Sequence, residues 1–91
     1  MMREPERITR AVPDWNRPLD WPITLADGTE LNNLSDARAF VLGLPEARQR
    51  QDRWQHVADL LIGAAERAER VHDATVRMEE ALFFEGRLPV E

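Results

Sequence analysis

The chain has 91 residues, no cysteine and a net charge of −5, from 12 arginines and no lysine against 17 aspartates and glutamates. This length fits one domain whose core is only just large enough for stability. The absence of cysteine excludes disulfide bonds and thiolate metal sites. The negative charge opposes general attraction to a phosphate backbone, so it argues against nucleic acid as a partner.

No apolar run approaches the roughly 20 residues that cross a bilayer. The opening residues, Met1 to Glu6, also lack the apolar core of a signal peptide. We therefore expect a cytoplasmic protein without a membrane-spanning segment.

Residues 1–14 are expected to form a flexible N-terminal segment, and residues 15–91 a single small domain. The first segment offers too little apolar surface to offset the entropy cost of ordering it. One feature of the chain is compatible with nucleic-acid binding, namely arginines close to a tryptophan. These residues are Arg3, Arg7, Arg10, Arg17 and Trp15.

Residues 15–22 contain two tryptophans, Trp15 and Trp21, between prolines that favour an extended backbone. Such a segment can lie as a strap across the domain's own core or serve as a docking segment for a partner. An Asp27-Gly28 step between short alternating runs follows, which predicts a β-hairpin over about 22–32. Two strands are barely stable alone, so the hairpin must pack on helices.

A short helix is predicted over about 36–42, with Ser35 as its N-cap and Gly43 closing it in the left-handed conformation. Residues 46–51 fit one helical turn or a loop. The main helix is predicted to start near Asp52, where Gln55 completes a pattern typical of a capping box. Gly86 and Pro89 end the helical region.

The segment from Trp54 to Leu82 carries apolar residues at alternating steps of four and three, which places them on one helical stripe. The helix either breaks at His72-Asp73, giving a helical pair, or continues unbroken for roughly 50 Å. We expect the unbroken form, whose exposed stripe would need a second copy of the chain. The fold class is therefore α+β and mostly helical: an N-terminal hairpin, a short helix, then a long C-terminal helix or helical pair.

Several short motifs follow the pattern of a known family. They are Trp21-Pro22-Ile23 before the hairpin, Ser35-Asp36-Ala37 at the first helix, and residues 73–78 with Ala81, Leu82 and Gly86 at the last. Over roughly residues 20–88 the chain resembles the small bacterial domain of unknown function catalogued under the number 982. It departs from that pattern at Thr75, at Met78 and in lacking a glycine-containing loop before the last helix. Because the family has no assigned activity, the resemblance implies no catalytic residue and no cofactor.

Two groups of residues have spacings that could place a histidine and carboxylates on one helix face as metal ligands. They are Asp52, His56 and Asp59, and Glu69, His72 and Asp73. On helices this charged, a solvated face is the simpler interpretation, and no HExxH-type spacing is present. Glu79, Glu80 and Glu85 are expected to face solvent, and no motif places a nucleophile beside them. We therefore assign no catalytic residue, metal ligand or cofactor.

The sequence predicts a noncatalytic protein-interaction or regulatory module, self-associating as a homodimer, with a further protein partner as an option. An acidic inhibitor or nucleic-acid mimic that binds a basic surface is an alternative function, and a small metal-dependent enzyme is a second alternative. The predicted interaction residues are aromatic or lie on the helical stripe. They are Trp15, Trp21, Trp54, Leu61, Met78, Leu82, Phe83 and Phe84.

Overall fold

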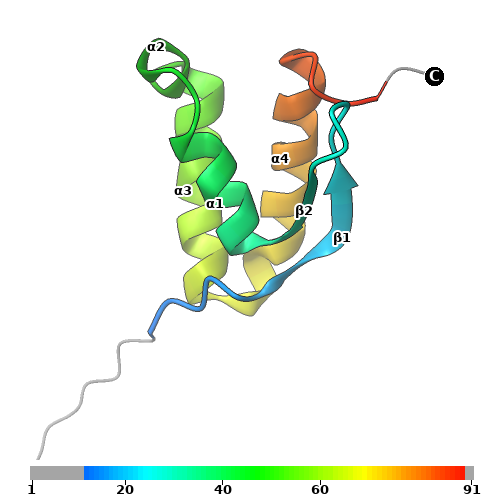
Figure 1. The fold of residues 1–91 in the computed structure, drawn as a ribbon. Coiled ribbons are helices and arrows are strands. Elements are labelled where there is room, and N and C mark those ends of the chain that lie inside the picture. The colour runs from blue at the N-terminus through cyan, green and yellow to red at the C-terminus, as the bar shows by residue number, and fades with distance from the viewer. Residues whose placement is uncertain (1–11, 90–91) are drawn as a thin grey trace, which may run out of the picture.

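The computed structural model describes residues 12–89 and shows an α+β fold that is mostly helical, as predicted (Figure 1). The hairpin comes first and the helices follow it. The elements are β1 (Pro18–Thr24), β2 (Glu30–Asn33), α1 (Leu34–Leu42), α2 (Glu46–Gln49), α3 (Asp52–Glu66), the 3₁₀ turn η1 (Ala68–Arg70) and α4 (Val71–Phe84).

Helices α3 and α4 lie side by side and run in opposite directions (Figure 1). Helix α1 packs on α3, while strand β1 packs on α4. One core fills the space between these elements. Its largest fully buried side chains include Trp54, Leu34, Met78 and Leu82. No helix within residues 12–89 is long and apolar enough to cross a membrane.

The predicted hairpin is present, and Gly28 adopts the positive φ of 91° that its turn requires. The strands are antiparallel, with Ile23 opposite Leu31, and the register shifts between Pro18 and Ile23. Strand β1 begins earlier than predicted because the extended segment ending at Pro22 continues directly into it. Proline is tolerated in a two-stranded sheet, where each strand has an open edge.

The C-terminal region forms a helical pair, so the expectation of an unbroken helix is wrong. Helix α3 ends at Glu66, and Arg67 takes an extended conformation with φ −137° and ψ 119°. The break lies before His72-Asp73, and a tertiary contact accompanies it. The backbone amide of Asp14 donates a 2.7 Å hydrogen bond to the carbonyl of Ala65, in the last turn of α3.

This break lets most of the apolar stripe fold against itself. Val57, Leu61 and Ala64 from α3 are buried, as are Val71, Met78 and Leu82 of α4, while Ala68 in the connection is exposed. The premise that the stripe is too extensive for its own chain to bury is therefore wrong. The homodimer is therefore no longer supported by an unburied apolar stripe, and it stays a prediction.

The N-cap of α1 is Asn33, and the prediction of Ser35 is wrong. The Asn33 side chain accepts a 2.8 Å hydrogen bond from the amide of Asp36, whose carboxylate in turn accepts from the amide of Asn32 at 2.9 Å. Ser35 lies in the first helical turn instead. At the other end, Gly43 is right-handed, with φ −83°, so the predicted left-handed closure is also wrong.

Residues 14–17 form a strap, which covers only the start of the strap predicted over residues 15–22, because Pro18 to Pro22 belong to strand β1. The carbonyls of Trp15 and Arg17 accept hydrogen bonds from the first amides of α1 at 2.8 and 3.0 Å, those of Ser35 and Leu34. The strap thereby joins the start of α1 to the end of α3. The predicted flexible segment, 1–14, lies largely outside the described residues.

The remaining helix ends follow local chemistry. Residues 46–49 form one helical turn, and α3 starts at Asp52 as predicted, although no side chain caps it. Gly86 has φ 76° and follows α4. The amide of Arg87 bonds the carbonyl of Leu82, and that of Gly86 bonds Phe83, which is the Schellman arrangement.

Candidate functional site

The eight predicted interaction residues divide into three groups. Four of them, Trp54, Leu61, Met78 and Leu82, are buried in the core. Placing them on an exposed surface is therefore wrong. Trp15 and Trp21 are half-buried against the core. Phe83 and Phe84 are exposed, at 66% and 61%, with their rings packed edge to face at 5.5 Å.

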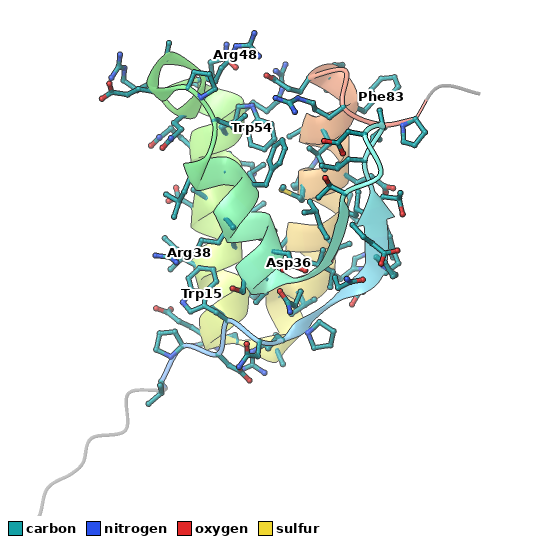
Figure 2. The ribbon with its side chains drawn as sticks, in the orientation of Figure 1. Trp15, Asp36, Arg38, Arg48, Trp54 and Phe83 are labelled. Carbon is teal, nitrogen blue, oxygen red and sulfur yellow. The ribbon has the colours of Figure 1, made fainter. Side chains whose placement is uncertain are left out.

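The side chain of Glu85 does not extend into solvent, contrary to the expectation that it does. Its side chain is only 5% exposed and pairs with the guanidinium of Arg48. It also accepts a 3.3 Å hydrogen bond from the indole nitrogen of Trp54. Figure 2 shows Arg48 and Trp54 at the end of the helical pair where α2 lies. This cluster therefore holds the ends of α3 and α4 together.

A first groove, the α1/α3 groove, runs between those two helices and has a volume of about 120 Å³. Its lining is almost entirely apolar. The lining residues are Trp15, Arg38, Val41, Leu42, Ala58, Leu61 and Ile62. Leu42 and Ile62 stand on opposite walls and remain 57% and 48% exposed. Isolated exposed aliphatics are normal, whereas these two stand together beside an apolar groove.

The walls of the α1/α3 groove differ in charge. Arg38 on the α1 wall holds its guanidinium 5.2 Å from the centre of the Trp15 ring, and Figure 2 shows the two side chains together. On α3, Asp59 and Glu66 lie three residues before and four after Ile62, so they flank it on one helix face. Both carboxylates are exposed. The α1 side is thus basic, and the α3 side is acidic beside the apolar residues that line the groove.

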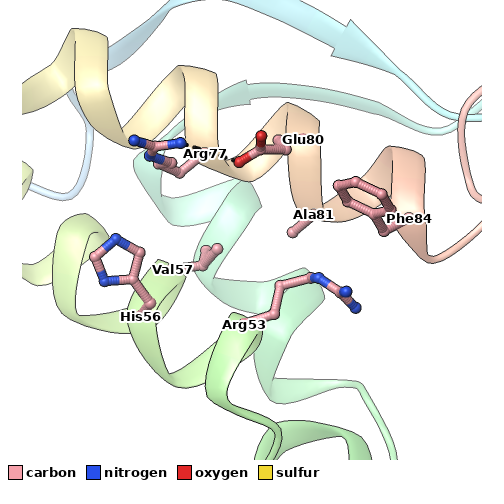
Figure 3. A pocket seen from close by; sticks show the side chains of 7 residues that line it. All are labelled: Arg53, His56, Val57, Arg77, Glu80, Ala81 and Phe84. Carbon is pink, nitrogen blue, oxygen red and sulfur yellow. Dashed lines mark hydrogen bonds and ion pairs between the residues drawn. The ribbon is translucent and has the colours of Figure 1, made fainter.

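A second groove, the α3/α4 groove, has a volume of about 330 Å³. Figure 3 shows Val57 and Ala81 at its centre and charged side chains around them. Its lining residues are Arg53, His56 and Val57 from α3, and Arg77, Glu80, Ala81 and Phe84 from α4. Although the chain as a whole is acidic, this lining carries two guanidinium groups against one carboxylate.

Contacts within the α3/α4 groove orient both guanidinium groups. That of Arg53 lies 5.0 Å from the centre of the Phe84 ring, a cation–π arrangement. That of Arg77 donates a 3.1 Å hydrogen bond to Glu80, three residues further along α4. A single bond to one carboxylate oxygen uses only one of the five donors of a guanidinium. Both arginines therefore keep donors for an anion in the groove.

The two groups of residues considered as metal ligands do not come together in the structure. Among residues 12–89, no three histidine, aspartate or glutamate side chains come together in a way that could hold a metal ion. His56 lines the α3/α4 groove, and His72 pairs through Nδ1 with Asp20 at 2.6 Å. The ring of Trp21 meets that of His72 edge to face at 5.9 Å.

The His72–Asp20 pair resembles the histidine and carboxylate of a catalytic triad. The neighbouring hydroxyl, that of Thr75, already makes hydrogen bonds to other groups. Thr75 is fully buried, and its hydroxyl donates a 2.9 Å hydrogen bond to the carbonyl of Val71. It accepts a second bond from the amide of Asp20 at 3.0 Å. A substrate cannot reach this oxygen, so the pair links β1 to α4 and provides no activated nucleophile.

Two carboxylates have lowered pKa values, and both lie outside the grooves. Hydrogen bonds from the backbone and side chain of Thr29 lower the pKa of Asp27 in the hairpin turn. The pKa of Glu69 is lowered by a hydrogen bond with its own backbone amide and then by the neighbouring Arg67. Hydrogen bonds to an ionised carboxylate favour its charged form, which explains why both pKa values are lowered.

Sequence reasoning missed both grooves, although one signal was available. Leu60, Leu61 and Ile62 are consecutive, and neighbours on a helix point about 100° apart, so one of them must leave the core-facing stripe. Ile62 is that residue. The α3/α4 groove gave no such signal, because its arginines look like ordinary residues of a solvated face.

Comparison of the chain with family models, with curated proteins and with solved structures finds no match.

Proposed function

We propose that this protein is a noncatalytic interaction module that self-associates through the α1/α3 groove. The observation that carries the proposal is the pair of exposed aliphatic side chains, Leu42 and Ile62, on either side of an almost entirely apolar groove. Covering these side chains gains roughly 25 cal/mol for each Å² of apolar surface removed from water. A second copy can supply that cover because each copy offers both the groove and its rim.

The charges beside the groove support a second copy as the occupant. A two-fold axis that runs along the groove would place the α1 wall of one copy against the α3 wall of the other. Arg38 of each copy then meets Asp59 and Glu66 of its partner. The surface is therefore self-complementary in charge as well as apolar.

Sedimentation velocity over a range of protein concentrations tests this proposal. The unchanged chain should move from monomer to dimer as concentration rises, and the Leu42→Glu, Ile62→Glu variant should remain monomeric. Phe83→Glu is the control, because it places a negative charge at an exposed apolar position of α4 that does not line the groove. A monomer at all concentrations, or equal loss of dimer with Phe83→Glu, would contradict the proposal.

Charge reversal tests the orientation of the interface separately. Arg38→Glu should weaken dimerisation, since it would place like charges opposite one another. Adding Asp59→Arg and Glu66→Arg to the same chain should restore it. Failure of this triple variant to dimerise, in a chain that remains folded by circular dichroism, would reject the two-fold arrangement and leave other dimers open.

A further inference from the structure

We propose that the α3/α4 groove binds an acidic peptide segment of a partner protein, with Arg53 and Arg77 recognising its carboxylates. This site lies on the other side of α3 from the α1/α3 groove and does not depend on self-association. Within the described chain, it brings two oriented guanidinium groups to one concave surface.

The charge of the groove favours an anionic occupant. Arg53 and Arg77 outweigh Glu80 among the lining residues, and His56 adds a further donor. Guanidinium–carboxylate hydrogen bonds are short, strong and frequently bidentate, and a guanidinium presents several donors in one plane. Arg77 can therefore bind a second carboxylate while it keeps its 3.1 Å bond to Glu80.

The shape and the apolar part of the groove favour a peptide. Val57 and Ala81 form a small apolar centre, and the exposed ring of Phe84 extends it at one end (Figure 3). A segment that alternates acidic and aliphatic side chains can direct carboxylates to the two arginines and place an aliphatic group between them. A volume of about 330 Å³ accommodates such side chains.

Pre-organisation adds to this recognition. The Phe84 ring holds the guanidinium of Arg53 at 5.0 Å, and Glu80 holds that of Arg77. Because both side chains already have partners, they lose less conformational freedom on binding than unsupported arginines would.

Fluorescence anisotropy with a short labelled peptide of alternating glutamate and leucine tests this inference. The peptide should bind, and affinity should fall as salt is raised, because exposed charge pairs are screened. Arg53→Gln or Arg77→Gln should each weaken binding about two- to fivefold, as expected when one partner of an exposed charge pair is removed. Arg50→Gln is the matched control, since Arg50 does not line the groove and forms an exposed pair with Glu46.

Several results would overturn the inference. They are equal binding of the same peptide with glutamine in place of glutamate, equal weakening by Arg50→Gln, and equally tight binding of a single-stranded DNA oligonucleotide. Amide chemical-shift changes on the unchanged protein provide a readout that needs no variant. They should centre on His56, Arg77 and Phe84, and changes centred on Leu42 and Ile62 would place the peptide in the wrong groove.

The monomeric Leu42→Glu, Ile62→Glu variant separates this inference from the proposed self-association. It should bind the acidic peptide with the affinity of the unchanged chain, within about twofold. Loss of peptide binding in that variant would show that the two surfaces are not independent and would overturn the assignment of the peptide to the α3/α4 groove.

Discussion

The hydroxyl of Thr75 accepts a hydrogen bond from the backbone amide of Asp20 at 3.0 Å and donates one to the carbonyl of Val71 at 2.9 Å. Thr75 is the buried polar residue of the core formed by residues 12–89. Its side chain thus connects β1 to α4. Thr75 is buried because it lies on the helical stripe. Its two hydrogen bonds explain why a residue with a hydroxyl can stand at this buried position.

Thr75→Val should lower the free energy of unfolding by about 1–3 kcal/mol. Valine keeps the shape of the side chain but leaves the Asp20 amide without its acceptor. Urea denaturation measures this change. The exposed strand residue Thr24 provides the control, and Thr24→Val should change stability by no more than about 0.5 kcal/mol. Equal effects of the two substitutions would show that the hydroxyl contributes nothing specific.

Arg48→Ala should lower the free energy of unfolding by about 1–3 kcal/mol. It removes the cation beside a carboxylate, that of Glu85, whose side chain is only 5% exposed. Denaturant unfolding of Arg48→Ala, Glu85→Gln and the double variant should reveal a coupling of at least about 0.5 kcal/mol. The exposed Arg50 pairs with Glu46 at the surface, so Arg50→Ala should have little effect.

Asn33→Ala should destabilise the protein by about 0.5–2 kcal/mol, because the side chain that caps the Asp36 amide is lost. Ser35→Ala should change stability by less than about 0.5 kcal/mol, since Ser35 lies inside the first turn. Thermal unfolding of the two variants side by side measures the difference. A larger loss with Ser35→Ala would restore Ser35 as the cap.

Asp27 should titrate below the ordinary aspartate pKa, because Thr29 donates hydrogen bonds to its carboxylate. A pKa that is lower in the folded state stabilises the hairpin above the unfolded pKa, and this stability is lost as pH falls through the folded pKa. NMR titration of the carboxyl carbon measures the midpoint. Thr29→Ala should raise it towards the ordinary value, and an unchanged midpoint would show that the Thr29 hydroxyl has no part in the shift.

Sequence reasoning succeeded where a few neighbouring residues determine the structure. The Asp27-Gly28 turn and the helix end before Gly86 depend on chemistry within one or two turns of the chain. These elements were predicted because a positive φ or a helix boundary leaves a local signature. The start of α3 at Asp52 was also predicted, but from a capping box that the structure lacks, since Gln51 is the N-cap and no side chain caps the helix.

Sequence reasoning failed where residues far apart in the chain decide which of two possible helix boundaries forms. The break at Arg67 coincides with the hydrogen bond from Asp14 to Ala65, and no glycine marks it. Likewise, Asn33 and Ser35 are both good capping residues. Carbonyls of the strap bond the amides of Leu34 and Ser35, and these contacts fit a helix that starts at Leu34.

The candidate sites were the least predictable part of the chain. Leu61 was expected on a surface because it belongs to the stripe, but the helical pair buries it and leaves Ile62 exposed beside it. Arg53 and Arg77 lie far apart in the sequence and line one groove only because α3 and α4 pack side by side. Periodicity describes one helix at a time, so it cannot reveal a groove between two helices.

The strap has a consequence for how this chain folds. Arg17 and Ala65, which hydrogen-bond each other, are 48 positions apart, so closing this contact costs entropy before it yields any bonding. We expect the N-terminal end to dock last, after the helices have collapsed together. It should also be the first part to open, and native-state amide exchange at Asp14 should report a lower opening free energy than exchange in the middle of α4.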